Sequence, residues 1–185
     1  MSNIRQEYRI GAEDKEERKD KNGEVRAVTC FFINENGQVL VQKRNKNLQR
    51  DPGKIDLCSG HIKEYQTPLQ AMMQEAEEEY GLPREETVNA RQMGEVVVNY
   101  KPEGRDITYH AFVYAQKIDK NRKFSPNEEV GSLQWIEFED LIYLIKETKE
   151  TRFPYASEYE SIFQKIREQY IQKEFTQKDR EMKER

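Results

Sequence analysis

One helix in this sequence has both of its ends marked, and it constrains the fold more than any other feature. Thr67 is a side-chain N-cap, Pro68 suits the first helical position, and Gln70 completes a capping-box pattern with Thr67. At the other end stands Gly81, a residue type that favours the left-handed position closing a helix. The pattern therefore predicts a helix over residues 68–80.

Segments rich in β-branched and aromatic residues lie on both sides of this helix in the sequence. They predict strands over 25–33, 38–43, 54–58, 92–100, 107–117 and 133–138. The Asn-Glu-Asn-Gly turn between the first two strands predicts a β-hairpin over 25–43.

The remaining segments predict loops and two further helices. Polar loops are expected over 44–53 and 118–132, and Ser59-Gly60-His61 is expected to break out of the third strand. A short helix is expected over 139–147. Residues 156–173 carry an apolar stripe at helical spacing, so this C-terminal helix is expected to pack on the domain or to mediate a homodimer.

Charged residues gather at the two ends of the chain. Mixed-charge runs occupy residues 13–24 and 173–185, and such runs bury too little apolar surface to offset the entropy of ordering them. The length of 185 residues fits one domain. The sequence predicts a single domain over 1–173, partly flexible in 1–24, and a frayed charged tail over 174–185.

Composition disfavours several classes of function. The net charge is −4 with both signs interspersed, whereas a nucleic-acid-binding surface clusters Lys and Arg. No apolar stretch approaches the roughly 18 residues that span a bilayer, and no signal peptide opens the sequence, so a cytoplasmic location is expected. Cys30 and Cys58 are expected to be buried free thiols, with a disulfide as the alternative.

Three glutamates share one face of the predicted helix. At about 100° per residue, Glu75, Glu78 and Glu79 fall within about 100° of one another, beside the apolar face. Like charges at this spacing repel each other by about 0.2–0.5 kcal/mol per pair. A cluster of carboxylate oxygens on a rigid face is what a hard divalent cation such as Mg²⁺ requires, although a solvated acidic face is the plainer alternative.

The segment from Gly60 to Leu82 resembles the Nudix box. That pattern is Gly, five residues, Glu, seven residues, Arg-Glu, an aliphatic residue, any residue, Glu-Glu, any residue, Gly and an aliphatic residue. In this chain Gly60 opens the segment, and its last nine residues keep the register: Gln74-Glu75-Ala76-Glu77-Glu78-Glu79-Tyr80-Gly81-Leu82.

The resemblance implies a fold and a cofactor. The fold would be a Nudix-type α/β/α sandwich, with a mixed sheet between the box helix and another helix, and an added C-terminal helix. The cofactor would be Mg²⁺, with Mn²⁺ as a substitute. The implied metal ligands are Glu75, Glu78, Glu79 and the Gly60 carbonyl.

The resemblance also implies an activity, the attack of water on a phosphorus of a small-molecule diphosphate such as a nucleoside diphosphate derivative. Glu78, Glu75 or Glu129 is the expected base, and Glu128 shares the loop of Glu129. Three basic residues flank the loop that leads into the box and are expected to bind the diphosphate, with ordinary surface charge as the alternative for each. They are Arg44, Arg50 and Lys54.

Two positions depart from the family pattern. Gln66 stands where the family has its first Glu, and Gln74 stands where it has Arg. A charged hydrogen bond from the family Arg orients the metal-binding glutamates, so Gln74→Arg is expected to raise metal affinity or turnover. These departures keep open a non-catalytic Nudix-like module that binds a nucleotide or a protein. A third, weaker alternative is an isoprenoid diphosphate isomerase, because the segment around Gly60 is loosely similar to that branch.

Overall fold

The computed structural model describes residues 23–100 and 107–171, and the predictions for the frayed tail and for nearly all of 1–24 lie outside those residues. Its strands are β1 (Val25–Ile33), β2 (Gln38–Arg44), β3 (Ile55–Asp56), β4 (Cys58–His61), β5 (Arg91–Tyr100), β6 (Ile107–Lys117) and β7 (Val130–Glu137). Its helices are α2 (Pro68–Tyr80), α3 (Arg84–Thr87), α4 (Phe138–Glu147), η2 (Ser157–Tyr159), α5 (Glu160–Ile166) and η3 (Arg167–Ile171).

The strands form one mixed sheet. Its order is β3-β2-β1-β6-β5, with β4 added on β1 and β7 added on β2. β1 and β6 run parallel from Val25↔Tyr109 to Ile33↔Lys117, whereas the other pairs are antiparallel. The parallel pair lies at the centre of the sheet, where strands are covered on both faces.

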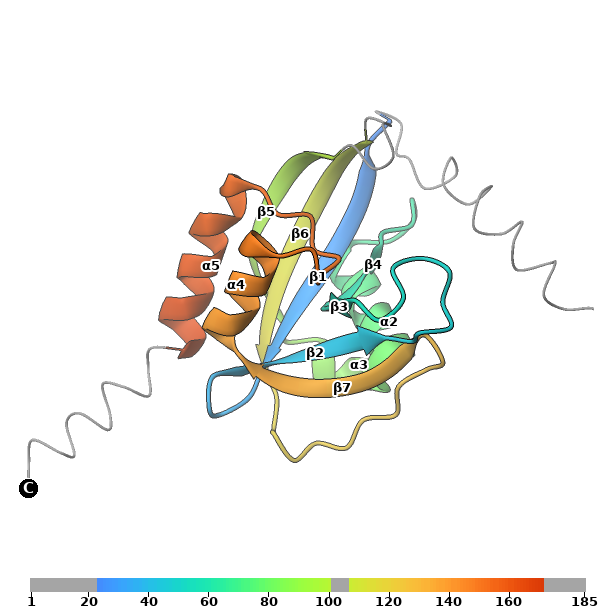
Figure 1. Ribbon diagram of the computed structural model, residues 1–185, viewed down its shortest axis with the longest axis vertical. Coiled ribbons are helices and arrows are strands. Elements are labelled where there is room, and N and C mark those ends of the chain that lie inside the picture. The colour runs from blue at the N-terminus through green and yellow to red at the C-terminus, as the bar shows by residue number, and fades with distance from the viewer. Residues whose placement is uncertain (1–22, 101–106, 172–185) are drawn as a thin grey trace, which may run out of the picture.

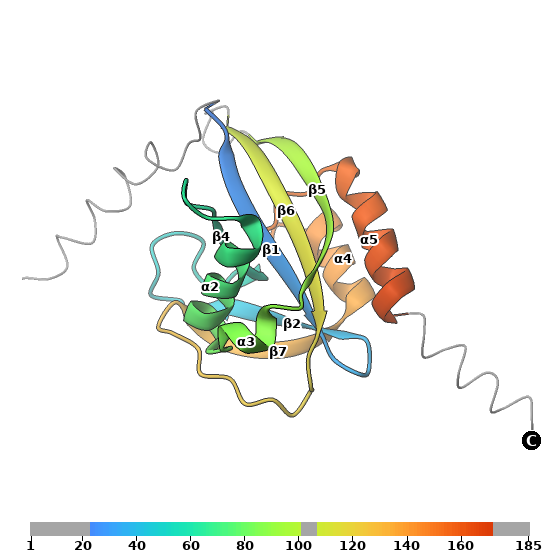
Figure 2. The same cartoon turned by 180° about the vertical axis from the view of Figure 1, so that it is seen from behind.

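Helices cover both faces of this sheet. α4 and α5 lie together on one face (Figure 1), and α2 lies on the opposite face (Figure 2). β1 serves both layers, because Phe31 and Ile33 join the core under α4 and α5 while Cys30 and Phe32 join the core under α2. The predicted α/β/α sandwich is therefore confirmed, and the C-terminal helix packs on the domain.

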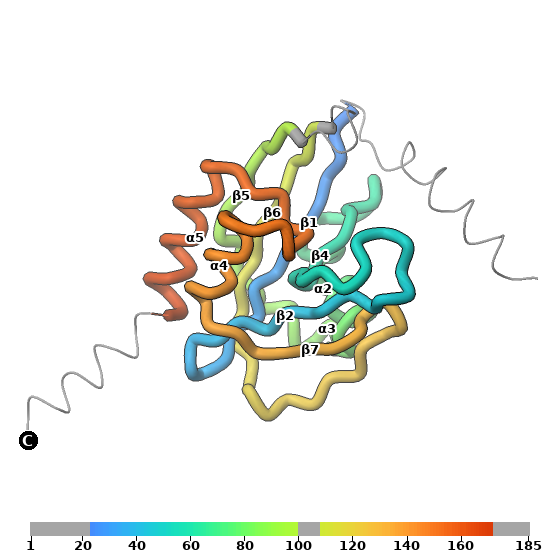
Figure 3. Tube along the Cα trace, viewed as in Figure 1, coloured from blue at the N-terminus to red at the C-terminus, as the bar shows by residue number. Residues whose placement is uncertain are grey.

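The predicted hairpin over 25–43 is wrong beyond its turn. β1 and β2 pair only at Ile33↔Val39, and β2 then pairs with β7 along its whole length. After this one pair, β2 diverges from β1 and runs across its lower end in the view of Figure 3. The reason is that the edge of β1 over residues 27–30 is already taken by β4, so β2 finds its partner elsewhere.

The strand predicted over 54–58 is two strands. β3 pairs with β2 and β4 pairs with β1, so the chain changes partners at the buried Leu57. Ser59, Gly60 and His61 consequently continue β4 instead of breaking out of it. At the C-terminus, the single helix predicted over 156–173 is divided into η2, α5 and a π-type turn, η3, within the described residues.

The box helix has the predicted bounds and caps. The Thr67 hydroxyl accepts from the Gln70 backbone amide, the Gln70 side chain accepts from the Thr67 amide, and Gly81 closes the helix at φ 66°. Cys30 and Cys58 lie directly opposite each other on β1 and β4, and both are free and buried, as predicted. Among the described residues, no helix is both long and apolar enough to span a bilayer.

Candidate active site

Glu75 of α2 packs directly against the backbone of Gly60 in β4. A Cβ atom added at Gly60 would lie 2.0 Å from Glu75 Cδ and 2.0 Å from Glu75 Oε1. A side chain at position 60 would therefore displace the end of the Glu75 side chain from the strand. The contact places one carboxylate of the helix against the main chain that opens the box.

Glu79 is buried between α2 and the sheet, with 7% of its surface exposed. The Ser59 backbone amide donates to Glu79 Oε2 at 3.2 Å, and Gln42 also hydrogen-bonds the carboxylate. Burial raises the pKa of Glu79 well above its ordinary value, and the nearby charges of Asp56 and Glu75 raise it further. Burial and neighbouring carboxylates thus both make the ionised form of Glu79 costly at this site.

Asp56 of β3 is a second buried carboxylate at this place. Burial raises its pKa, an effect that Arg152 opposes through an ion pair from Nη1 to Asp56 Oδ2 at 3.0 Å. Arg152 Nε also approaches Asp51 Oδ2 at 3.3 Å. The Ser59 hydroxyl donates to Asp56 Oδ1 at 3.4 Å, so Ser59 contacts both buried carboxylates.

Sequence reasoning missed Asp56 and Arg152. An aspartate inside the apolar run of residues 54–58 is a signal that could have been noticed, because a strand buries such a residue only beside a partner. Arg152 gave no comparable signal. It reaches the site because Thr151 makes a parallel bridge with Ile55, which brings the segment after α4 beside β3.

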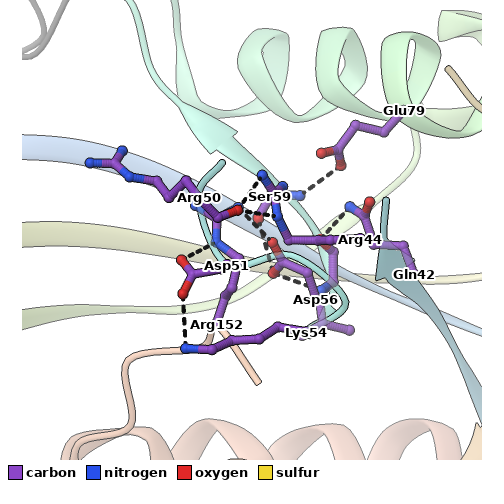
Figure 4. A network of polar contacts seen from close by, with 10 residues as sticks. Gln42, Arg44, Arg50, Asp51, Lys54, Asp56, Ser59, Glu79 and Arg152 are labelled. Atoms are coloured by element: carbon purple, nitrogen blue, oxygen red, sulfur yellow. Dashed lines mark hydrogen bonds and ion pairs between the residues drawn. The ribbon is translucent and has the colours of Figure 1, made fainter. Parts of the chain in front are cut away.

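The three predicted basic residues have different surroundings (Figure 4). Arg44 is buried, and its Nε and Nη2 both donate to the Arg50 carbonyl at 3.3 Å. The Arg50 side chain extends away from Glu79 into solvent. Lys54 Nζ pairs with Asp51 Oδ1 at 2.8 Å, on the far side of the network from Glu79.

Arg44 stands between the two acidic groups that the sequence singled out. Its pKa is lowered by burial and by the charge of Arg152, whereas Asp56, Glu129 and Glu79 act in the opposite direction. The pKa of Arg44 therefore depends on charges of both the box helix and the loop before β7. Among the three predicted basic residues, Arg44 is thus buried and under the influence of both acidic groups.

Glu129 and Glu128 lie on the exposed loop that leads into β7. Asn45 ties this loop to the end of β2, since its backbone amide donates to the Glu129 carbonyl at 2.8 Å and its side chain to the Glu128 carbonyl at 2.9 Å. The Glu129 side chain is exposed, and its charge raises the pKa of Arg44. The loop and the entrance to the site are thus held together by their main chains.

Glu78 is exposed on α2, whereas the neighbouring Glu79 is buried. Its Oε1 accepts from Gln74 Nε2 at 2.6 Å, and Gln74 Oε1 accepts from Gln66 Nε2 at 2.6 Å. Among the described residues, no three acidic, His or Cys side chains stand close enough together to hold a metal ion. Carboxylates are nevertheless the kind of donor that Mg²⁺ prefers.

An α/β/α sandwich with an acidic helix seated on the glycine that opens its loop defines a Nudix-type domain. The model of the NUDIX domain family matches residues 23–159, which is most of the chain, so the protein belongs to this family. Among curated proteins, none matches the sequence.

Solved structures of low sequence identity share the fold. The MutT protein from Methanosarcina mazei Go1 is 19% identical with a TM-score of 0.56, covering 78% of this chain and 94% of its own. The NUDIX domain of Shewanella oneidensis NrtR, solved with ADP ribose, is 14% identical with a TM-score of 0.55, covering 85% and 97%. A C. elegans Ap4A hydrolase is 17% identical with a TM-score of 0.52, covering 77% and 94%.

Proposed function

We propose that this protein is a Mg²⁺-dependent hydrolase that cleaves the diphosphate linkage of a nucleoside diphosphate derivative. One observation carries the proposal: the buried Arg44 guanidinium is within electrostatic reach of both Glu79 of the box helix and Glu129 of the loop before β7, and the charges of both raise its pKa. An arginine near carboxylates suits a site where a substrate phosphate and a metal ion bind together. The guanidinium can bind the phosphate, and the carboxylates can bind the metal.

The proposed metal ligands are Glu75, Glu78, Glu79 and the Gly60 carbonyl, with Mn²⁺ as an accepted substitute. A bound cation would neutralise charge that develops on the phosphate and lower the pKa of an attacking water. Glu79 gains most from a cation, because its buried charge has no full counter-charge within hydrogen-bonding distance among the described residues. Glu78 is the first candidate for the base, since it is exposed and can turn, and Glu75 and Glu129 are the others.

The proposed phosphate clamp is Arg44. The Arg44 Nη1 group has no hydrogen bond to another described residue, so it remains available to a phosphate oxygen. The Arg50 side chain extends into solvent, so it would contact only the outer end of the substrate. Lys54 would not contact the substrate and would instead hold Asp51 in place. The Ap4A hydrolase and the ADP ribose-bound NUDIX domain make nucleoside diphosphates joined to a second group the first substrates to test.

A non-catalytic nucleotide-binding module is the second candidate. The glutamines at positions 66 and 74 favour it, because neither supplies the charge that the family uses there. The retained glutamates of α2 favour the enzyme. The isomerase alternative is the weakest, because the cysteine and histidine arrangement expected of that branch is not evident in the sequence, and Cys30 and Cys58 are both buried.

A panel assay separates these candidates. Nucleoside triphosphates, nucleotide sugars, dinucleoside polyphosphates and dinucleotide cofactors are incubated with the protein, with and without Mg²⁺, and the products are separated by chromatography. We expect Mg²⁺-dependent cleavage of at least one class, abolished in the double variant Glu78→Gln, Glu79→Gln. Tight binding of a nucleotide with no product in any condition would favour the module.

A further inference from the structure

The two departures from the Nudix box contact each other. Gln66 lies in the loop before α2 and Gln74 lies in its second turn, and their side chains meet through a 2.6 Å hydrogen bond from Gln66 Nε2 to Gln74 Oε1. Gln74 Nε2 then donates to Glu78 Oε1 at 2.6 Å. At the other end, the Lys63 backbone amide donates to Gln66 Oε1 at 3.1 Å.

These contacts form a relay with a direction. Each glutamine accepts through its carbonyl oxygen and donates through its amide nitrogen, so the relay runs from the Lys63 amide to the Glu78 carboxylate. A glutamate at position 66 could accept from Lys63 but could not donate to Gln74. An arginine at position 74 could donate to Glu78 but could not accept from Gln66.

Charge gives a second reason why the two positions go together. A Glu at position 66 with an Arg at position 74 has a net charge of zero, and so has the Gln66–Gln74 pair, because one charge of each sign is removed. Replacing one glutamine alone changes the charge beside Glu78 by one unit. Only the two matched combinations pair a donor with an acceptor between the two positions and also keep the local charge, although the Glu and Arg pair does so with the donor at position 74 instead of position 66.

We propose that Gln66 and Gln74 are a matched neutral pair that positions Glu78, replacing the charged pair of the family pattern. Both are positioning residues, since they act through Glu78. The importance of Glu78 for metal rests on the proposed function, whereas the coupling between the glutamines does not. The pair explains how this chain departs from the pattern twice and still holds the loop to the helix.

This contact reverses the expectation for a single Arg at position 74. Gln74→Arg leaves the Gln66 amide nitrogen without its acceptor and adds a positive charge where a cation is to bind. We therefore expect Gln74→Arg alone to weaken Mg²⁺ binding by about ten-fold or more, the size of effect typical of residues that orient metal ligands. Adding Gln66→Glu to that variant is expected to restore the affinity.

The test is a double-mutant cycle over wild type, Gln66→Glu, Gln74→Arg and the double variant. Titration calorimetry with Mg²⁺ alone measures affinity, and denaturant unfolding without metal measures stability. We expect the double variant to bind Mg²⁺ at least about ten-fold more tightly than the sum of the two single-variant effects predicts. We also expect it to unfold at a higher denaturant concentration than either single variant. Additive effects in both measurements would overturn the proposal.

Two further variants serve as controls. Gln70→Glu adds a negative charge to the same helix while keeping the acceptor that Thr67 uses, so we expect wild-type unfolding and no coupling to Gln74→Arg. Gln74→Met removes the relay without changing charge, and it should weaken Mg²⁺ binding while Gln70→Glu does not. In wild type, the Gln66 and Gln74 side-chain amide signals in a ¹H–¹⁵N spectrum should both shift on adding Mg²⁺.

The unfolding cycle keeps the proposal separate from the proposed function. If wild type binds no Mg²⁺, the metal site fails, while coupling in metal-free unfolding still supports the matched pair. If Mg²⁺ binds and the cycle shows no coupling, the matched pair fails and the metal site stands.

Discussion

The Ser59 backbone amide donates a hydrogen bond to Glu79 Oε2 across 3.2 Å. This bond joins β4, where the box opens, to the last turn of α2, and it makes Glu79 the buried end of the acidic face. The pKa of Glu79 is raised by burial and by Asp56 and Glu75, so the carboxylate is costly to ionise without a cation. Helix α2 and strand β4 are thus held together by a carboxylate that a bound metal ion would stabilise.

The first prediction concerns pH. With its pKa raised, folded Glu79 keeps a proton to higher pH than the unfolded chain does. Its contribution to stability is therefore complete below the ordinary value of 4.5 and is lost as pH rises above it. We expect Glu79→Gln to reduce the loss of unfolding free energy between about pH 5 and about pH 8 in metal-free protein, and also to weaken Mg²⁺ binding.

Chemical denaturation at the two pH values measures this effect, and Glu77→Gln is the matched control. Glu77 is an exposed glutamate of the same helix that pairs with Arg84. A pH dependence that is the same in Glu79→Gln and in Glu77→Gln would contradict the assignment.

The second prediction concerns the pair between Arg152 and Asp56. Asp56 is 7% exposed and Arg152 29%, so removing the cation leaves a buried carboxylate without its main counter-charge. We expect Arg152→Met to lower the free energy of unfolding by about 3–5 kcal/mol. The more exposed pair of Lys54 with Asp51 is the control, and Lys54→Met should cost about 0–1 kcal/mol. Both losses of unfolding free energy are measured by urea denaturation. Equal losses would show that the Arg152–Asp56 pair stabilises the protein no more than the exposed Lys54–Asp51 pair does.

Features of the fold that depend on residues close in the sequence could be predicted from the sequence. The pairing of strands and the contacts between distant residues could not. The bounds of α2 follow from Thr67 and Gly81, which act within a few residues of their own position. The pairing of β2 with β7 and the contact of Arg152 with Asp56, 96 residues apart, depend on which strand edges are already occupied. Gln66 and Gln74 were both noticed in the sequence, but their contact across eight residues required the loop geometry before α2.

The third prediction concerns the substrate clamp. Arg44→Lys keeps the positive charge but loses the planar fork that binds two phosphate oxygens. We expect KM to rise by about ten-fold, equivalent to about 1.4 kcal/mol, with a smaller change in kcat. Arg50→Lys, made in the neighbouring exposed side chain, should leave KM within about two-fold because that side chain extends into solvent. A larger effect at position 50 than at position 44 would place the clamp in the outer loop.

The fourth prediction concerns the two cysteines. Burial raises the pKa of Cys30 and of Cys58, so both thiols stay protonated and closed to reagents in the folded protein. We expect native protein to react with a maleimide only at the rate of unfolding, and denatured protein to react at both sites. Mass spectrometry of the labelled protein measures the rates. Fast labelling of either cysteine under native conditions would contradict their burial.

The most direct measurement of the central claim is turnover in ¹⁸O-labelled water. A substrate cleaved in the panel is incubated with Mg²⁺, and its phosphate products are analysed by mass spectrometry. We predict one ¹⁸O atom in one phosphate product per bond cleaved, and at least about a hundred-fold slower labelling in the double variant Glu78→Gln, Glu79→Gln. Absence of Mg²⁺-dependent label for every substrate class, or equal labelling by the wild type and the double variant, would contradict a diphosphate hydrolase built on these glutamates.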